Sequence, residues 1–334
     1  MKTGIKKVEV ACNNCGSTQC DFVTTGREHE YTNTTDDDFT VVKCRNCSLH
    51  YLNPRPDVSE LGTIYPPQYY AYHLQTKNVE SENQNSLLYK ARKFVYLSRL
   101  EKALAHCNSS DNALKVLDIG CADGRALNWY RQIESKKVET HGVDFDHIAA
   151  QQAREAGHTV YEGRFEDVAI PRDYFDMAVA THVIEHVADP KSFAARAFEV
   201  VRPGGIFLLE TPNIDSFDAG FFRNHHWGGY HFPRHWVFYS ADTILNLVNQ
   251  IGFELVEIRY HPAPAFWNWT FHSMGVQNPQ FRKAADYLFP PADFQKNNLK
   301  NLLAACLYTS FDVVQKAATG KTSNMSLLLR RPIQ

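Results

Sequence analysis

The sequence has no apolar run long enough to cross a bilayer, and its first residues contain no apolar stretch of signal-peptide length. A membrane span needs about 20 consecutive apolar residues, and a secretory leader needs an apolar core of about 7 to 15. The 35 Lys and Arg residues are balanced by 37 Asp and Glu residues, so the basic excess that displaces counterions from nucleic acid is also missing. We therefore expect a cytoplasmic protein with no transmembrane segment and no nucleic-acid partner.

The composition is that of an ordinary globular protein, with 44% hydrophobic and 22% charged residues in a chain of 334. This length accommodates one large α/β domain and a smaller module. The chain also has eight cysteines. In the reducing cytoplasm, cysteines more naturally serve as metal ligands or buried thiols than as disulfides.

Four of the cysteines form two pairs with the same spacing, Cys12 with Cys15 and Cys44 with Cys47. A two-residue spacer lets both sulfurs of a tight turn face one metal, and two such turns complete a tetrahedral zinc site. Strand-like residues lie between the pairs, which is typical of a zinc ribbon. Because no ligand position is left open, we expect the zinc to be structural. Four unrelated thiols or a redox pair are the alternatives, and the repeated spacing argues against both.

Three regions follow from the pattern along the chain: a zinc ribbon over 1–55, a linker with a lead-in helix over 56–110, and an α/β domain over 111–334. The polar run 75–86 is typical of a loop or flexible linker, and the apolar spacing over 87–106 predicts a helix.

From residue 113 onward, apolar strand candidates alternate with helical stretches. This alternation predicts crossover units and a mostly parallel sheet covered on both faces. The expected strands are 114–118, 138–143, 159–161, 175–180, 206–210, 254–260 and 325–330, and the expected helices are 124–134, 147–156, 190–200 and 241–251. An insertion at about 261–322 carries an amphipathic helix over 299–317, which either packs on the domain or lies at a membrane surface.

The most informative segment runs from Val116 to Arg125, where an apolar strand leads into a glycine-rich turn and a helix. Glycines let the backbone pass close to a ligand at the carboxyl edge of a sheet. A dinucleotide site would have the G-x-G-x-x-G spacing, whereas here Gly120 and Gly124 are separated by three residues and Asp118 lies just upstream. An acid in this place repels phosphates but suits a ligand with an ammonium and a sulfonium.

Residues 117–124, LDIGCADG, resemble the first motif of class I S-adenosylmethionine-dependent methyltransferases, with Ala122 in place of the middle glycine. The resemblance extends over roughly residues 113–260 and implies an α/β fold with a Rossmann-like doubly wound sheet and S-adenosylmethionine as cofactor. It further implies that Asp144 binds both ribose hydroxyls and that Phe145 lies against adenine. Arg164 stands where the family often has an acid. The implied cofactor-binding residues are Asp118, Gly120, Cys121, Gly124, Asp144, Phe145, Phe165, Glu166 and His182.

The whole layout, ribbon included, resembles a zinc-ribbon subgroup of these enzymes that includes sugar C-methyltransferases. Methyl transfer from a sulfonium is an in-line displacement, so a general base is needed only when the nucleophile must lose a proton. Histidine suits that role near neutral pH. Related enzymes place a substrate-side histidine in the region of His231 and His235, so our order of candidates is His235, His231, then His182 and Glu185. For each histidine, a surface or structural role is the alternative.

We therefore expect an S-adenosylmethionine-dependent methyltransferase that acts on a small molecule such as a sugar, a nucleotide-linked sugar or a secondary metabolite. The first alternative is a protein or RNA methyltransferase that docks its target with the zinc ribbon. The second is a non-catalytic binding protein of the same fold, against which the intact acids Asp118 and Asp144 argue. A homo-oligomer is compatible with the sequence.

Overall fold

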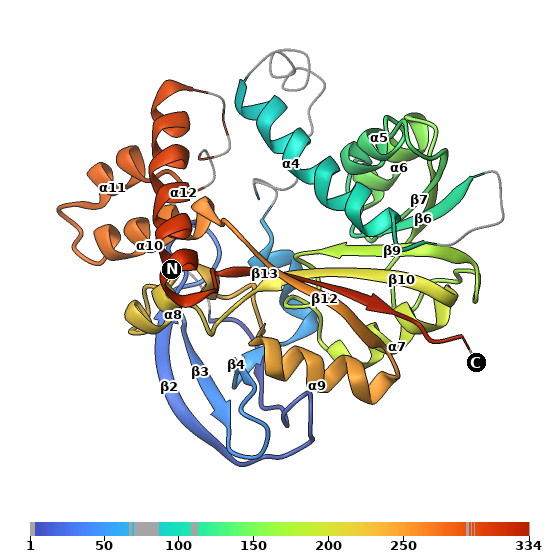
Figure 1. Ribbon diagram of the computed structural model, residues 1–334. Helices are drawn as coiled ribbons and strands as arrows, with labels where there is room; N and C mark the ends of the chain where they lie inside the picture. Colours follow the sequence, from blue (N-terminus) through green and yellow to red (C-terminus); the bar gives the residue numbers. More distant parts are fainter. Residues whose placement is uncertain are drawn as a thin grey trace.

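The computed structural model describes residues 4–66, 69, 87–107, 113–291, 294, 296 and 298–333. The predicted polar linker 75–86 lies outside these residues. A seven-stranded sheet forms the centre of the molecule, with helices on both sides (Figure 1). This arrangement confirms the predicted α/β class.

The central sheet has the strand order β12-β13-β10-β9-β6-β7-β8. All its neighbouring pairs are parallel except those of β13, which runs antiparallel to both β10 and β12. The strands are β6 (Leu114–Ile119), β7 (Val138–Asp144), β8 (Thr159–Glu162), β9 (Phe175–Thr181), β10 (Val201–Pro212), β12 (Glu254–His261) and β13 (Asn324–Arg330). Six of the seven residues of β9 are buried, as expected for a central strand covered on both faces.

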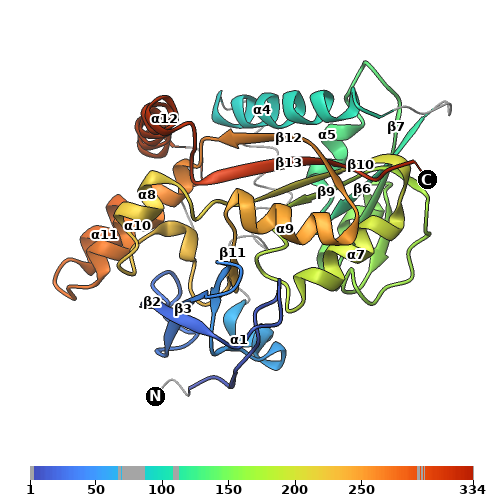
Figure 2. The same cartoon turned by 60° about the horizontal axis from the view of Figure 1, so that its bottom comes forward.

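Helices lie on both faces of the sheet, with α4 on one side and α7 and α9 on the other (Figure 2). Helix α5 packs beside α4, and α7 packs beside α9. Side-chain caps fix several of the helix starts, such as Asp189 before α7 and Ser240 before α9. The bounds are α4 (Leu87–Leu104), α5 (Arg125–Tyr130), α6 (His147–Glu155), α7 (Pro190–Val200), α8 (Phe217–Phe221) and α9 (Ala241–Ile251).

The insertion before the last strand is helical, as predicted, and consists of α10 (Pro264–Val276), α11 (Arg282–Leu288) and α12 (Leu299–Thr319). Helix α12 packs against α10, but it buries a mostly polar stripe that includes Asn301, Asp312 and Gln315. Leu303 is 61% exposed, and Leu299, Leu307, Val313 and Val314 are also exposed. The apolar positions that reveal this helix in the sequence are therefore largely turned away from the protein.

The N-terminal module forms a second sheet below the central one (Figure 2). Its strand order is β11-β4-β3-β2, so three N-terminal strands are completed by a strand that follows β10 in the chain. The strands of this sheet are β2 (Cys20–Arg27), β3 (Asp38–Cys44), β4 (His50–Leu52) and β11 (Val237–Phe238). A separate two-stranded pair consists of β1 (Lys7–Val8) and β5 (Arg55–Pro56). The short helices η1 (Val58–Glu60) and α1 (Leu61–Ile64) follow β5 in the chain. The predicted ribbon thus shares a sheet with the rest of the chain.

The segment before β11, which includes η2 (Gly228–Tyr230), docks against the module through backbone and aromatic contacts. Leu52 donates its backbone N–H to the carbonyl oxygen of Trp236 at 2.9 Å. The ring of Phe232 passes so close to Gly26 that a Cβ atom there would lie 2.1 Å from Phe232 Cε2. This close approach explains why glycine occupies the position.

None of the helices in the described ranges combines the length and the apolar character needed to cross a membrane.

Candidate active site

The central sheet reverses its winding direction between β6 and β9, because the chain moves outward from β6 through β7 to β8 and then returns to β9. Loops at such a point diverge and leave a crevice at the carboxyl ends of the strands, where α/β proteins bind ligands. The glycine-rich turn after β6 and the segment after β9 both start at this crevice. The sheet topology therefore brings the first and fourth sequence motifs together.

The turn after β6 depends on left-handed backbone conformations at three positions. The φ angles are 79° at Gly120, 46° at Ala122 and 80° at Gly124. A Cβ atom at Gly124 would lie 2.8 Å from His158 Cδ2 and 3.1 Å from Ala153 Cβ, so this glycine also lets α5 approach α6. Ala122 adopts the conformation that glycine favours, in the place where the resembling motif has glycine.

A cavity of about 780 Å³ opens at the carboxyl ends of the strands. Its floor comes from the segments that follow β6, β7, β8 and β9, and its other walls come from the N-terminal region and the start of α10. The predicted residues Gly120, Asp144, Phe145, Phe165, Glu166, His182 and His235 line it. Asp118, Cys121, Gly124, Glu185 and His231 are not among the lining residues.

Asp144 ends β7 with both carboxylate oxygens held by backbone groups. Its Oδ2 accepts the N–H of Ala122 at 2.9 Å, and its Oδ1 accepts the N–H of Asp146 at 2.9 Å. A carboxylate oxygen has two lone pairs, so each can accept a further hydrogen bond from a ligand hydroxyl. Phe145, next in sequence, is 59% exposed although it lines the cavity. An exposed aromatic ring beside an oriented carboxylate is a suitable contact for a nucleoside.

Two nearby acids, Asp144 in the cavity lining and Asp118 outside it, are both costly to ionise. Burial and the charge of Asp144 raise the pKa of Asp118 to about 8, and burial also raises the pKa of Asp144. An anionic ligand would add to this repulsion, whereas a ligand with ammonium and sulfonium charges would relieve it. The donor set therefore fits S-adenosylmethionine, with Asp144 available for its ribose and the acids favouring its cationic end.

An ionic cluster lies at the other end of the cavity, around His182. Its Nδ1 atom is 3.0 Å from Glu185 Oε1, and its Nε2 atom is 3.7 Å from Glu210 Oε1. Burial opposes the charged imidazole, but the hydrogen bonds and charges of the two carboxylates prevail and raise the pKa of His182 to about 10. His182 therefore carries a proton near neutral pH. Its φ of 55° places a non-glycine residue in the left-handed region, a strain that often accompanies functional sites.

Glu210 is a cavity residue that the sequence motifs do not assign. It accepts hydrogen bonds from Arg99 Nη1 at 3.2 Å and from Asn324 Nδ2 at 2.6 Å. Burial alone would raise its pKa, but His182 and Arg99 outweigh burial and lower it to about 2. Arg99 lies on α4 and Asn324 starts β13, so no local spacing could have connected them with the β9 motif.

The two leading catalytic candidates occupy different environments. His235 lines the cavity, and its Nδ1 lies 2.8 Å from the carbonyl oxygen of Gly229. Since a carbonyl only accepts, Nδ1 carries the proton and Nε2 keeps its lone pair. Burial and neighbouring histidines lower the pKa of His235 well below its usual value. His231 is buried against Glu30 of the N-terminal module, at 2.5 Å, and stacks on Trp269.

Aromatic side chains form much of the wall opposite the sheet. They come from the segment after α1, from α4 and from the start of α10, and a ring of Phe266 meets His182 edge-on with centroids 6.1 Å apart. The aromatic lining residues outside the predicted motifs are Tyr65, Tyr69, Tyr96, Phe193, Trp236, Phe266, Trp269 and Phe294. Trp269 is therefore a wall residue, whereas Trp267 packs among Phe294, Ala305 and Tyr308.

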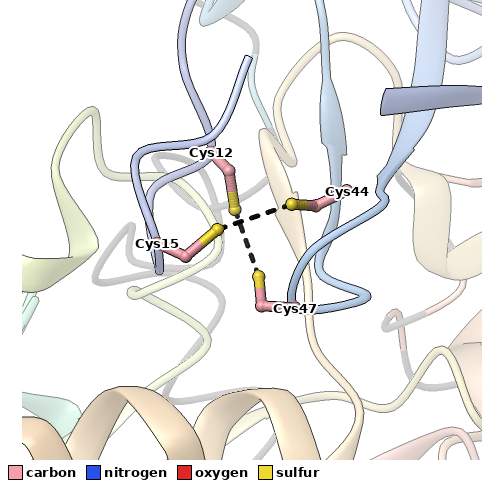
Figure 3. Close-up of side chains that lie close together, drawn as sticks. All are labelled: Cys12, Cys15, Cys44 and Cys47. Carbon is pink, nitrogen blue, oxygen red and sulfur yellow. Dashed lines mark hydrogen bonds between the residues drawn. The ribbon is translucent and has the colours of Figure 1, made fainter. Parts of the chain in front are cut away.

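The four paired cysteines, which are not among the lining residues, converge at one point with their sulfurs turned toward one another (Figure 3). The sulfurs of Cys12 and Cys47 are 3.3 Å apart, and those of Cys15 and Cys44 are 3.5 Å apart. Thiolates around a zinc ion with Zn–S bonds of about 2.3 Å lie roughly 3.8 Å from one another. A small outward movement of the sulfurs would complete such a site, so this donor set fits zinc.

Comparisons with known proteins agree with the fold and the motifs. Residues 89–258 match the model of a family described as a methyltransferase domain. A probable S-adenosylmethionine-dependent methyltransferase of Mycolicibacterium smegmatis is 32% identical over 120 residues, which cover 35% of this chain and 44% of that protein. A ubiquinone biosynthesis O-methyltransferase of Azorhizobium caulinodans is 36% identical over 103 residues, which cover 30% of this chain and 41% of that protein. The matches thus span less than half the length of these curated relatives.

Among solved structures, phosphoethanolamine N-methyltransferase 2 of Haemonchus contortus in complex with S-adenosyl-L-methionine aligns with a TM-score of 0.49 and 15% identity. The alignment covers 98% of this chain and 71% of that one.

Proposed function

Since the chain belongs to the methyltransferase-domain family, whose model spans residues 89–258, we propose that it transfers a methyl group from S-adenosylmethionine to a small molecule. The observation that carries this proposal is the division of one cavity into two chemically different ends. Gly120, Asp144 and Phe145 line it at the ends of β6 and β7, and His182 and Glu210 line it at β9 and β10, on the other side of the switch point, together with His235.

The first end provides the contacts that a nucleoside with a cationic tail requires. The free lone pairs of the Asp144 carboxylate accept the two ribose hydroxyls, and Phe145 covers the base. Asp118 and Asp144 favour positive charge nearby. S-adenosylmethionine, when bound, supplies an activated methyl on a sulfonium. The protein's task is to hold the acceptor atom in line with that methyl and to keep water away.

The second end orients the acceptor. The Arg99–Glu210 ion pair and the His182–Glu185 hydrogen bond present charged donors and acceptors beside an aromatic wall. Protonated His182 donates its Nδ1–H to Glu185, and its Nε2–H, 3.7 Å from Glu210, is the donor that remains for an acceptor oxygen. His235 presents a neutral ring whose Nε2 lone pair is available at the cavity.

The lining favours a small acceptor with polar groups on one side and a flat or apolar side that contacts the aromatic wall. Sugars, nucleotide-linked sugars and hydroxylated secondary metabolites have this character. We propose a hydroxyl of such a molecule as the acceptor, since charged hydrogen-bonding groups meet the cavity at this end.

We also propose that the four paired cysteines hold a structural zinc ion that stabilises the N-terminal module. The first cysteine loop contacts the rest of the chain through Asn14, whose Nδ2 donates to the carbonyl oxygen of Thr243 on α9 at 2.7 Å. A zinc-fixed loop would therefore stabilise the docking of the module on the methyltransferase domain.

The first test is calorimetric titration of zinc-loaded protein with S-adenosylmethionine and S-adenosylhomocysteine. We expect micromolar binding that Asp144→Ala weakens by about 2 kcal/mol or more, the scale of lost charged hydrogen bonds. Asp167→Ala is the matched control, because Asp167 is an exposed acid that does not line the cavity. Screening of hydroxylated acceptors by transfer of a labelled methyl group follows.

Two results would contradict the proposal. Folded, zinc-loaded protein that binds neither ligand would leave a non-catalytic binding protein as the better conclusion. Equal losses in the two variants would mean that Asp144 makes no specific contact with the ligand.

A further inference from the structure

Three side chains at the acceptor end of the cavity are grouped in a way that methyl transfer does not itself require. Glu185, His186 and His235 each bring one possible ligand atom to within 4.8 Å of the other two. Glu185 Oε1 and His235 Nε2 are 4.0 Å apart. We propose that these residues bind a divalent metal ion that holds an oxygen of the methyl acceptor, an inference that rests on the proposed function.

Both imidazole rings are held through the nitrogen that a metal would not use. Nδ1 of His235 lies 2.8 Å from the carbonyl oxygen of Gly229. Nδ1 of His186 lies 3.0 Å from the carbonyl oxygen of Arg234 and 2.8 Å from the hydroxyl oxygen of Tyr65, which can also accept. Metal-binding histidines commonly donate their second ring N–H to a carbonyl, which fixes both the tautomer and the ring orientation. The same arrangement leaves Nε2 of each ring free to coordinate an ion.

The carboxylate is fixed as firmly as the rings. Glu185 is fully buried, and its Oε2 accepts a hydrogen bond from Thr211 Oγ1 at 3.2 Å. Its Oε1 accepts from His182 Nδ1 at 3.0 Å and keeps a second lone pair. The backbone carbonyl of Glu185 accepts from the N–H of Trp236, which ties the two ligand-bearing segments together at 2.8 Å.

The site is at the cavity surface, because His186 and His235 both line the cavity. Ligand atoms on one metal with bonds of about 2.1 Å lie roughly 3 to 4 Å apart, so small side-chain adjustments would bring this group into contact with an ion. Two imidazoles and one carboxylate leave further coordination positions open. These positions face the acceptor and would suit a hydroxyl with a neighbouring oxygen, as in a vicinal diol or a catechol.

A divalent ion here would change how the acceptor hydroxyl is activated. The lone pair of His235 would coordinate the ion and would no longer take a proton. The ion would lower the pKa of the bound hydroxyl instead, and the released proton would leave to water. The cysteine cluster would not compete for a hard or borderline ion such as Mn²⁺, because thiolates select zinc.

The test uses zinc-loaded full-length protein titrated with MnCl₂, with free Mn²⁺ followed by electron paramagnetic resonance. We expect one Mn²⁺ per chain, with affinity reduced at least tenfold in His235→Ala and in the milder variant His186→Gln. His226→Ala is the control, because His226 is hydrogen-bonded to Ser273 and does not line the cavity. Calorimetry with S-adenosylhomocysteine verifies that each variant retains the cofactor site.

Folded wild-type protein that binds no Mn²⁺ would overturn the proposal. So would Mn²⁺ binding that is unchanged in both histidine variants, since the ion would then lie elsewhere. Failure of the proposed function alone would give a different result. Mn²⁺ binding would be present and would be weakened by His235→Ala, but neither S-adenosylmethionine nor S-adenosylhomocysteine would bind.

Discussion

Nδ1 of His231 lies 2.5 Å from Oε1 of Glu30, and both side chains are buried where the N-terminal module meets the rest of the chain. The same junction contains Arg234 paired with Glu28, and a contact between His29 and His272 with 2.9 Å between their Nδ1 atoms. Glu30 Oε2 is buried without a hydrogen-bond partner among the described residues. The module is thus attached through ionisable groups that have been removed from water, so its attachment should depend on pH.

Glu30→Gln tests this dependence. Burial raises the pKa of Glu30 from 4.5 to about 7, although the charges of Arg234 and His272 lower it. Between these values the unfolded chain has lost the proton while the folded chain keeps it, so wild-type stability falls as pH rises through this window. Glutamine does not titrate. The stability of Glu30→Gln relative to wild type should therefore rise by about 3 kcal/mol from pH 4.5 to pH 8.

Urea unfolding at a series of pH values measures this difference. Glu60→Gln is a suitable control, because Glu60 is also in the N-terminal region but lies outside the buried junction. A difference between Glu30→Gln and wild type that stays constant with pH would mean that Glu30 does not change protonation in this range.

Gly26→Ala should weaken the same junction by a steric route. The added methyl would lie 2.1 Å from Phe232 Cε2, and overpacking of this kind typically costs about 1 to 3 kcal/mol. Gly62→Ala is the matched control, because a Cβ there has no atom within 4 Å. The difference between the urea unfolding midpoints of the two variants measures the cost of the clash between the added methyl and Phe232. Equal midpoints would show that Phe232 moves aside at little cost.

Cys47→Ser should remove zinc from the N-terminal module and lower the free energy of unfolding by at least about 2 kcal/mol. Cys306→Ser should keep zinc and stability, because Cys306 is exposed on α12, far from the cluster in sequence. Elemental analysis gives the stoichiometry, for which we expect one zinc per wild-type chain. Full zinc content in Cys47→Ser would exclude the four-cysteine site.

Binding of S-adenosylmethionine should release a proton near pH 7. Without ligand, burial and Asp144 hold the pKa of Asp118 at about 8, so its carboxyl group is largely protonated. The positive charges of the ligand favour the carboxylate and lower that pKa in the complex. Affinity should therefore increase as pH rises from about 5.5 to 7, by up to about tenfold per pH unit.

Calorimetry in buffers of different ionisation enthalpy counts the released protons. The chosen range keeps the ligand's own amino group protonated, since α-amino groups titrate at about 7.7 to 8.0. In Asp118→Asn, the proton release and the increase of affinity with pH should both disappear. A slope that persists in this variant would assign the titration to another group.

The sequence alone predicts the central elements well, because buried parallel strands are apolar runs and their helices have a clear period. The predicted helix 241–251 coincides with α9, and 190–200 coincides with α7. The cavity end containing Gly120, Asp144 and Phe145 was also predictable, since each of these residues directly follows or ends a strand.

The parts that the sequence could not predict depend on contacts between distant segments. Arg99 and Asn324 meet Glu210 only because α4 and β13 are placed against β10 by the folded sheet. Strand β11 is two residues long and has no sequence pattern of its own. For α12, the apolar period correctly predicts a helix but not the direction its apolar side faces, since Asp312 and Gln315 bind buried partners from α10 and α8.

The sharing of a sheet between β4 and β11 has a consequence for how the chain folds as it is synthesised. The cysteines, β2, β3 and β4 leave the ribosome early, but β11 follows roughly 180 residues later. At translation rates of about 5 to 20 residues per second, the N-terminal strands wait roughly 10 to 40 s for their last neighbour. During that interval β4 is an open edge, and the zinc ion that we propose at the four cysteines would hold the two cysteine loops together before β11 is made.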